Sequence, residues 1–177
     1  MQLPPVEVFI SWPQGNYAHP SEVRGPAVLI ITLISVPILL ILVSLRMYTR
    51  LRLTKNFGPD DVTILLAFIP TVGCAVLTLI AVKYHGWDRH VWDVRPDQLE
   101  TSLKYAIAVE VLFSLACSLT RLSVLLLICR IMSAGSSILR RLAMAVMVLV
   151  VIEELVFCVV AINTCRCVSR PHLILLC

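Results

Sequence analysis

The third long apolar segment of this chain carries polar side chains at positions that share one face of a helix. Glu110, Ser114, Cys117, Ser118 and Arg121 are spaced 4, 3, 1 and 3 residues apart. Residues at such spacings form one stripe along a helix of 3.6 residues per turn. Within a membrane, a carboxylate, hydroxyls and a guanidinium on one stripe can bind a ligand, conduct protons or hold helices together. The spacing leaves these alternatives open.

Two further carboxylates, Glu153 and Glu154, lie near the centre of the next apolar segment. Neighbouring residues point about 100° apart on a helix, so at most one of them faces the third segment squarely. A charge that faces lipid at the helix centre costs at least about 2.5–3.5 kcal/mol, so the stripe should face other helices or trapped water. Glu110 and Arg121 lie roughly 16 Å apart along the axis. We therefore predict that Arg121 is held by a carboxylate of the later segment, Glu153 first.

Motifs for catalysis and cofactor binding are absent from the sequence. It contains no HExxH, no GxSxG, no P-loop and no GxGxxG. His85 and His90, with no cysteine nearby, make a poor metal site. We expect a protein that is not an enzyme, with no catalytic residues, no cofactor and no metal.

The elements that position these side chains are predicted to be transmembrane helices. The 177 residues are 59% hydrophobic and 15% charged, with a mean hydropathy of +0.91, which excludes a disordered chain, a nucleic-acid-binding domain and most small soluble enzymes. Four apolar segments are long enough to cross a hydrocarbon core of about 30 Å as helices. They are residues 26–45, 62–82, 105–128 and 142–161. The sequence thus predicts an all-α transmembrane bundle with tails at residues 1–25 and 162–177.

The density of basic residues predicts the orientation of the bundle. The short loops 46–61 and 129–141 hold seven Lys and Arg residues in 29 positions, whereas the two tails and loop 83–104 hold seven in 63. Crowded basic residues beside helix ends keep short loops in the cytosol. We therefore expect these two loops inside, the N-terminus outside, and contact between the basic loops and the anionic inner leaflet.

The link between the first two segments combines basic and acidic residues. Four cations alternate with apolar side chains, which is typical of a segment lying at the membrane interface with its cations near lipid phosphates; they are Arg46, Arg50, Arg52 and Lys55. Asp60 and Asp61 follow a Gly-Pro pair at the start of the second segment. Carboxylates there suit helix capping, worth roughly 0.5–2 kcal/mol, and a contact used in signalling is the alternative.

Together these residues resemble the fungal rhodopsin-domain family, integral membrane proteins of seven helices that are distantly similar to G-protein-coupled receptors. The family's motifs are matched by Arg46, Tyr48 and Arg50 after the first helix, by Gly58, Asp60 and Asp61 before the second, and by Gly86 and His90 in the outer loop. The chain departs from the pattern at Asp88, where the family has a second glycine. The resemblance covers about the first four helices, so we expect a truncated form of the seven-helix fold.

The resemblance implies a receptor-like role in sensing or signalling, with a cavity lined by Glu110, Arg121 and Glu153 or Glu154. Retinal is not implied, because the three lysines are expected in loops. The alternative is a small oligomeric transporter or channel subunit, or a fragment without activity of its own. The expected partners are the lipid bilayer and other helices or further copies of the chain, in the plasma membrane, and not nucleic acid. The residues identify neither a ligand nor a G protein.

Overall fold

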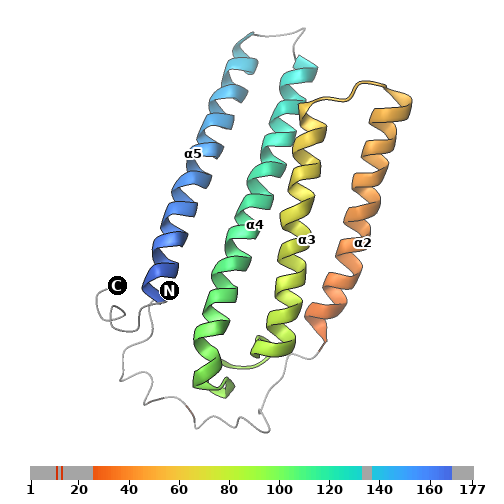
Figure 1. The fold of residues 1–177 in the computed structure, drawn as a ribbon. Coiled ribbons are helices and arrows are strands. Elements are labelled where there is room, and N and C mark those ends of the chain that lie inside the picture. The colour runs from red at the N-terminus through yellow and green to blue at the C-terminus, as the bar shows by residue number, and fades with distance from the viewer. Residues whose placement is uncertain (1–10, 12, 14–25, 133–136, 169–177) are drawn as a thin grey trace.

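The computed structural model describes residues 11, 13, 26–132 and 137–168. Long helices follow one another in this part of the chain: α2 (Ala27–Tyr48), α3 (Pro59–His85), α4 (Pro96–Ile131) and α5 (Ser137–Val168). A π-helical turn, η1 (Thr49–Leu53), continues α2, and a short 3-10 turn, η2 (Val91–Asp93), lies between α3 and α4. Figure 1 shows the long helices standing side by side in chain order, each antiparallel to the next.

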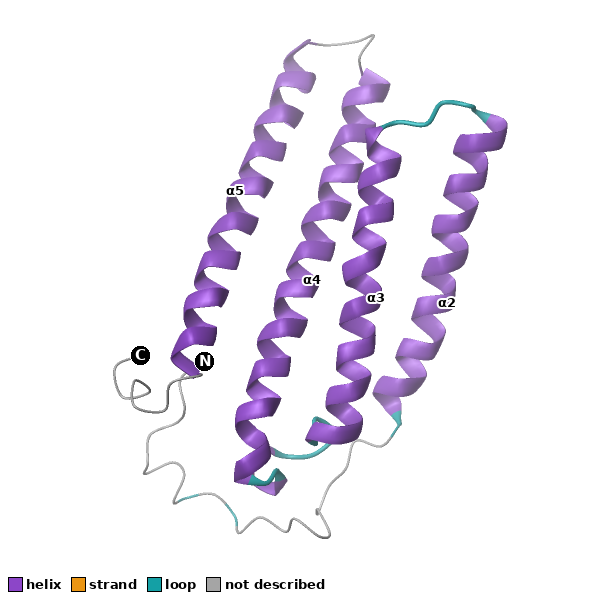
Figure 2. Ribbon diagram, in the orientation of Figure 1, coloured by secondary structure: helices purple, strands orange, loops and turns teal. Residues whose placement is uncertain are grey.

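Each of these four helices is long and apolar enough to cross a membrane, and no strand occurs in the described ranges (Figure 2). The predicted all-α transmembrane class is confirmed. Large apolar side chains such as Ile31, Ile41 and Leu149 are more than 60% exposed, which suits a surface that meets lipid. The buried apolar side chains are small, because helices in a bilayer pack closely where small residues meet; they are Ala67, Ala81, Ala116, Ala143 and Val150.

The helices are longer than the apolar segments that predict them. α3 begins at Pro59 and not at residue 62, and α4 begins at Pro96 and not at residue 105. α5 covers residues 137–168 in place of 142–161. Hydropathy marks only the part of a helix that suits lipid, whereas backbone hydrogen bonding continues into polar residues. Lys83 and Lys104, which were expected in loops, therefore lie within α3 and α4. Of the expected C-terminal tail, residues 169–177 lie outside the described residues.

Local sequence signals set the two ends of α3. Gly58 is the N-cap in an extended conformation, and Pro59 takes the first helical position, where no N–H donor is needed. At the other end, Gly86 has φ +69°, the left-handed conformation that helix C-caps commonly adopt and that glycine adopts without strain. The backbone N–H of Trp87 then donates to the carbonyl of Ala81 and turns the chain toward α4.

The helices differ in how much of their surface is covered. α3 and α4 share the most extensive interface, α5 packs against α4, and α2 contacts α3 at the edge of the row. α2 has no buried residue. Its attachment to the rest of the bundle therefore depends strongly on the polar contacts at its C-terminal end.

Candidate functional site

The two aspartates at the start of α3 are fully buried. Asp60 and Asp61 are both 0% exposed, and they occupy the first helical turn after Gly58 and Pro59. Asp61 Oδ2 accepts a hydrogen bond from the backbone N–H of Gly58 at 3.2 Å. The backbone carbonyl of Asp60 accepts one from Ser123 Oγ of α4 at 2.6 Å. The capping interpretation is thus confirmed for Asp61, but capping does not explain why both carboxylates are buried.

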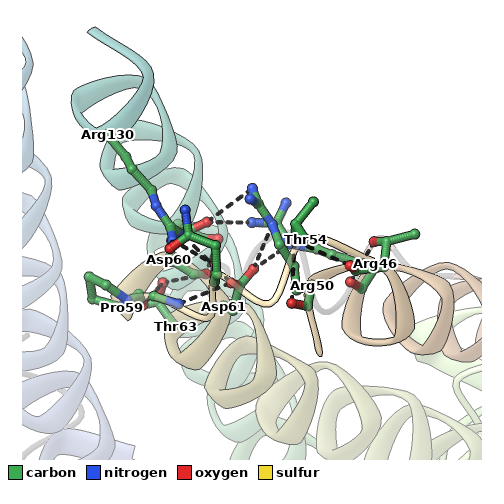
Figure 3. Close-up of polar contacts among 12 residues, drawn as sticks. Arg46, Arg50, Thr54, Pro59, Asp60, Asp61, Thr63 and Arg130 are labelled. Atoms are coloured by element: carbon green, nitrogen blue, oxygen red, sulfur yellow. Dashed lines mark hydrogen bonds and ion pairs between the residues drawn. The ribbon is translucent and has the colours of Figure 1, made fainter. Parts of the chain in front are cut away.

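Three arginines surround these carboxylates (Figure 3). Arg46 of α2 donates from Nη2 to Asp60 Oδ2 at 3.0 Å and from Nε to Asp61 Oδ1 at 3.2 Å. Arg50 of η1 approaches the same two oxygens, each at 3.5 Å. Arg130 of α4 donates from Nη1 to Asp60 Oδ1 at 2.9 Å. We call these five residues the aspartate cluster.

Arg130 also fixes the loop that leads into α3. Its Nη2 donates to the backbone carbonyl of Asn56 at 2.6 Å and to the side-chain carbonyl of the same residue. Gly58 lies so close that a Cβ atom there would be 2.5 Å from Arg130 Nη1 and 2.6 Å from Asp60 Oδ1. A Cβ atom at this N-cap would therefore require the Arg130 guanidinium or the Asp60 carboxylate to shift.

The aspartate cluster joins α2, α3 and α4 at one end of the bundle. Breaking a buried ion pair by removing one partner typically costs about 3–5 kcal/mol, because a buried charge is left uncompensated. The interpretation of the basic link as a lipid anchor stays a prediction, and it did not include the contacts that the guanidinium groups of Arg46 and Arg50 make with the aspartates. Arg52 and Lys55 in the same link are exposed.

Part of the aspartate cluster could have been found in the sequence. Arg46 and Arg50 are one helical turn apart, and a short link separates them from two adjacent carboxylates, so an antiparallel pair of helices brings them together. Arg130 and Ser123 were missed, because they lie more than 60 residues from Asp60 and no local pattern indicates that contact.

The polar stripe of α4 splits between two surroundings in the structure. Ser114 and Ser118 face α5, and their hydroxyls donate to Glu154 Oε2 at 2.8 and 2.9 Å. The thiol of Cys158 lies 3.7 Å from the other oxygen of Glu154. This half-buried carboxylate therefore binds α4 to α5 through hydrogen bonds, as polar residues between membrane helices commonly do.

The remaining charges of the stripe lie on the surface. Arg121 Nη1 is 3.5 Å from Glu153 Oε2, which is the pair predicted from the sequence, but the two side chains are 59% and 70% exposed. Glu110 is also exposed. Within the described ranges α4 packs against α3 and α5 only, so no helix covers these residues. The expectation that the whole stripe faces other helices or trapped water stays a prediction for them.

The opposite end of the bundle holds a small polar cavity of about 90 Å³. It lies where α3 turns toward α4, and its lining includes Gly86 and the cations Lys83, Arg89 and Arg95. His90, the other motif residue between α3 and α4, does not line it, and its ring stacks on Trp92 with centroids 4.4 Å apart. Within the described residues, no group of three His, Cys, Asp or Glu side chains is placed to hold a metal ion.

Comparison with known proteins assigns the chain to a family. The sequence model of the fungal rhodopsin domain matches residues 45–172, well over half of the chain. No curated protein and no solved structure matches significantly. The matched range includes the whole aspartate cluster and the contacts of Glu153 and Glu154 with α4. With four helices able to span a membrane and this match, the chain is a multi-pass membrane protein that belongs to the fungal rhodopsin domain family.

Proposed function

We propose that this protein is a receptor-like, non-enzymatic component of the plasma membrane, with its N-terminus outside, that signals through a rearrangement of helices at the aspartate cluster. The observation that carries the proposal is the joining of three helices by buried ion pairs at one end of the bundle. Switching proteins commonly repack ion pairs at helix contacts when they change state. A small shift of α2 or α4 would separate atoms now 2.9–3.2 Å apart.

The other end supports the same proposal. The connection from α3 to α4 holds the polar cavity near Gly86, whose lining includes the buried Asp93 beside the three cations. α3 and α4 run without interruption from that cavity to the aspartate cluster. A ligand that moved these two helices relative to each other at the outer end would act on the cluster at the inner end. The proposal gives the chain no retinal and no catalytic group.

Asp60→Asn tests this function without a known ligand. The substitution removes the charge that Arg46 and Arg130 both bind, so the cluster should open without stimulation. In fungal cells carrying reporters for cyclic AMP and calcium, the variant should change basal output relative to the wild type at matched surface amounts. Arg52→Gln is the control, because Arg52 is exposed and outside the cluster. Unchanged output from both reporters, with Asp60→Asn at the surface, would contradict the receptor proposal.

A transporter or channel subunit is the second candidate, favoured by the exposed Arg121–Glu153 pair and by Glu110 on membrane-spanning helices. In that case further copies of the chain would cover these charges and complete a permeation path. Vesicles containing the purified protein would conduct ions or protons above the level of protein-free vesicles, and Arg121→Leu would abolish the conductance. Such a result would favour this function over the receptor.

A further inference from the structure

The aspartate cluster contains one more positive charge than negative charges. Three guanidinium groups meet two carboxylates, and the carboxylates are fully buried whereas the side chains of the arginines are 21–28% exposed. The part of the cluster that meets its surroundings is therefore cationic. An uncompensated guanidinium at the end of a membrane-spanning helix attracts anions, most strongly where water is partly excluded.

All four carboxylate oxygens have a hydrogen-bond donor other than Arg50. Asp60 Oδ2 and Asp61 Oδ1 accept from Arg46, Asp60 Oδ1 accepts from Arg130, and Asp61 Oδ2 accepts from the Gly58 N–H. The side chain of Arg50 makes ion pairs at 3.5 Å only, beyond the usual length of a charge-assisted hydrogen bond. Arg50 is therefore the surplus cation of the cluster.

The backbone after Arg50 folds back on itself and contains a second cation, Lys55. The N–H of Thr54 donates to the carbonyl of Thr49, and the N–H of Asn56 donates to the carbonyl of Arg50. These bonds fold the link back on the π-helical turn, with Lys55 between them in a left-handed conformation. Lys55 is exposed, so its ammonium adds to the positive potential at this edge of the membrane-spanning region.

We propose that Arg50 binds a phosphate group at the membrane surface. The planar guanidinium matches two phosphate oxygens with parallel N–H bonds, and one phosphate would neutralise the surplus charge. The group can come from the headgroup of an anionic phospholipid or from inorganic phosphate. This site goes beyond the proposed function, and only its position on the cytosolic side rests on that proposal.

The site is tested by calorimetric titration of the purified full chain in a neutral detergent. One arm uses a short-chain phosphatidylinositol monophosphate, a second uses inorganic phosphate, and a third uses short-chain phosphatidylcholine, which has no net charge. Saturable binding with one site per chain is expected in the first or the second arm, and the arm that binds identifies the source of the phosphate. Absence of saturable binding in both would overturn the proposal.

Arg50→Gln and Arg52→Gln form a matched pair of variants, because each removes one cation from the same turn. Arg50→Gln should weaken binding about tenfold or more, as expected for loss of a hydrogen-bonded charge pair. Arg52→Gln should weaken it no more than about fivefold, the effect of one basic residue near an anionic surface. Equal losses would indicate diffuse attraction and overturn the site.

The stability of Arg50→Gln without ligand provides an independent check. Since every carboxylate oxygen keeps a donor, this variant should unfold at the wild-type temperature, whereas Arg46→Gln, which removes two hydrogen bonds, should unfold at a lower temperature. If Arg50→Gln fails to fold, Arg50 is not surplus and the proposal is wrong. The titration needs no cell, so phosphate binding with unchanged reporter output would refute the receptor function and leave the site standing.

Discussion

At Gly58 the chain passes between Arg130 and Asp60 with no room for a side chain. Its φ of −139° is extended backbone that any residue can adopt, so only steric contacts, and no backbone strain, oppose a substitution there. In Gly58→Ala the new Cβ would lie 2.5 Å from Arg130 Nη1, and overpacking of this kind typically costs about 1–3 kcal/mol. We expect a loss of that size in the free energy of unfolding, measured by denaturant titration in mixed micelles.

Gly73→Ala is the control for this substitution. A Cβ at Gly73 would contact only Leu112 Cδ1, at an ordinary 3.4 Å, and alanine in a helix interior is favoured over glycine by about 0.5–1 kcal/mol. The control should therefore unfold at a slightly higher denaturant concentration than the wild type. If Gly58→Ala is as stable as Gly73→Ala, the crowding at the cluster has no energetic consequence.

Individual residues could be predicted where their partners are local. The capping bond of Asp61 involves a residue three positions away, and the sequence indicates it through a carboxylate after Gly-Pro. The ion pairs of Arg130 depend on how α4 rotates and slides against α3, which is set by the summed packing of both helices. Its partners therefore emerge only from the folded structure.

At the scale of the helices, the contact between α4 and α5 contains two separable polar pairs. Arg121 pairs with Glu153, whereas Glu154 accepts hydrogen bonds from Ser114 and Ser118. A double-mutant cycle with Arg121→Leu and Glu153→Leu should give a coupling energy of about 0.5–3 kcal/mol, measured as unfolding free energy in lipid–detergent micelles. The cycle with Arg121→Leu and Glu154→Leu should be closer to additive. Additivity in the Glu153 cycle would mean that this ion pair contributes nothing.

The existence of the helices could be predicted from the sequence, but which helices pack against one another could not. Long apolar segments dictate helices in a bilayer because the backbone has no other way to satisfy its hydrogen bonds. The positions of Glu110 and Arg121 on one stripe follow from helical geometry, but which element covers that stripe does not. The helices extend beyond the predicted apolar segments by up to nine residues, at Pro96, because hydropathy contains no information on how far a helix extends into water.

The whole molecule presents its two ends to different compartments, and the orientation is open to a direct test. Thr54 in the basic link and Val91 in η2 are both exposed. We expect that Val91→Cys reacts with a membrane-impermeant thiol reagent in intact cells and that Thr54→Cys reacts only after permeabilisation. The wild-type chain, which has cysteines of its own, gives the background. Labelling of Thr54→Cys alone in intact cells would reverse the orientation.

The positions of the cluster residues along the chain determine the order in which their ion pairs can form during synthesis. Arg46 is 14 and 15 residues from the two aspartates, whereas Arg130 is 70 residues from Asp60. At roughly 5–20 residues per second, the ribosome completes the α2–α3 hairpin several seconds before Arg130 exists. During that interval two arginines face two aspartates, so the hairpin can enter the bilayer with its buried charges balanced. Once Arg130 has been added to the chain, it donates to Asp60, and Arg50 becomes the surplus cation of the cluster.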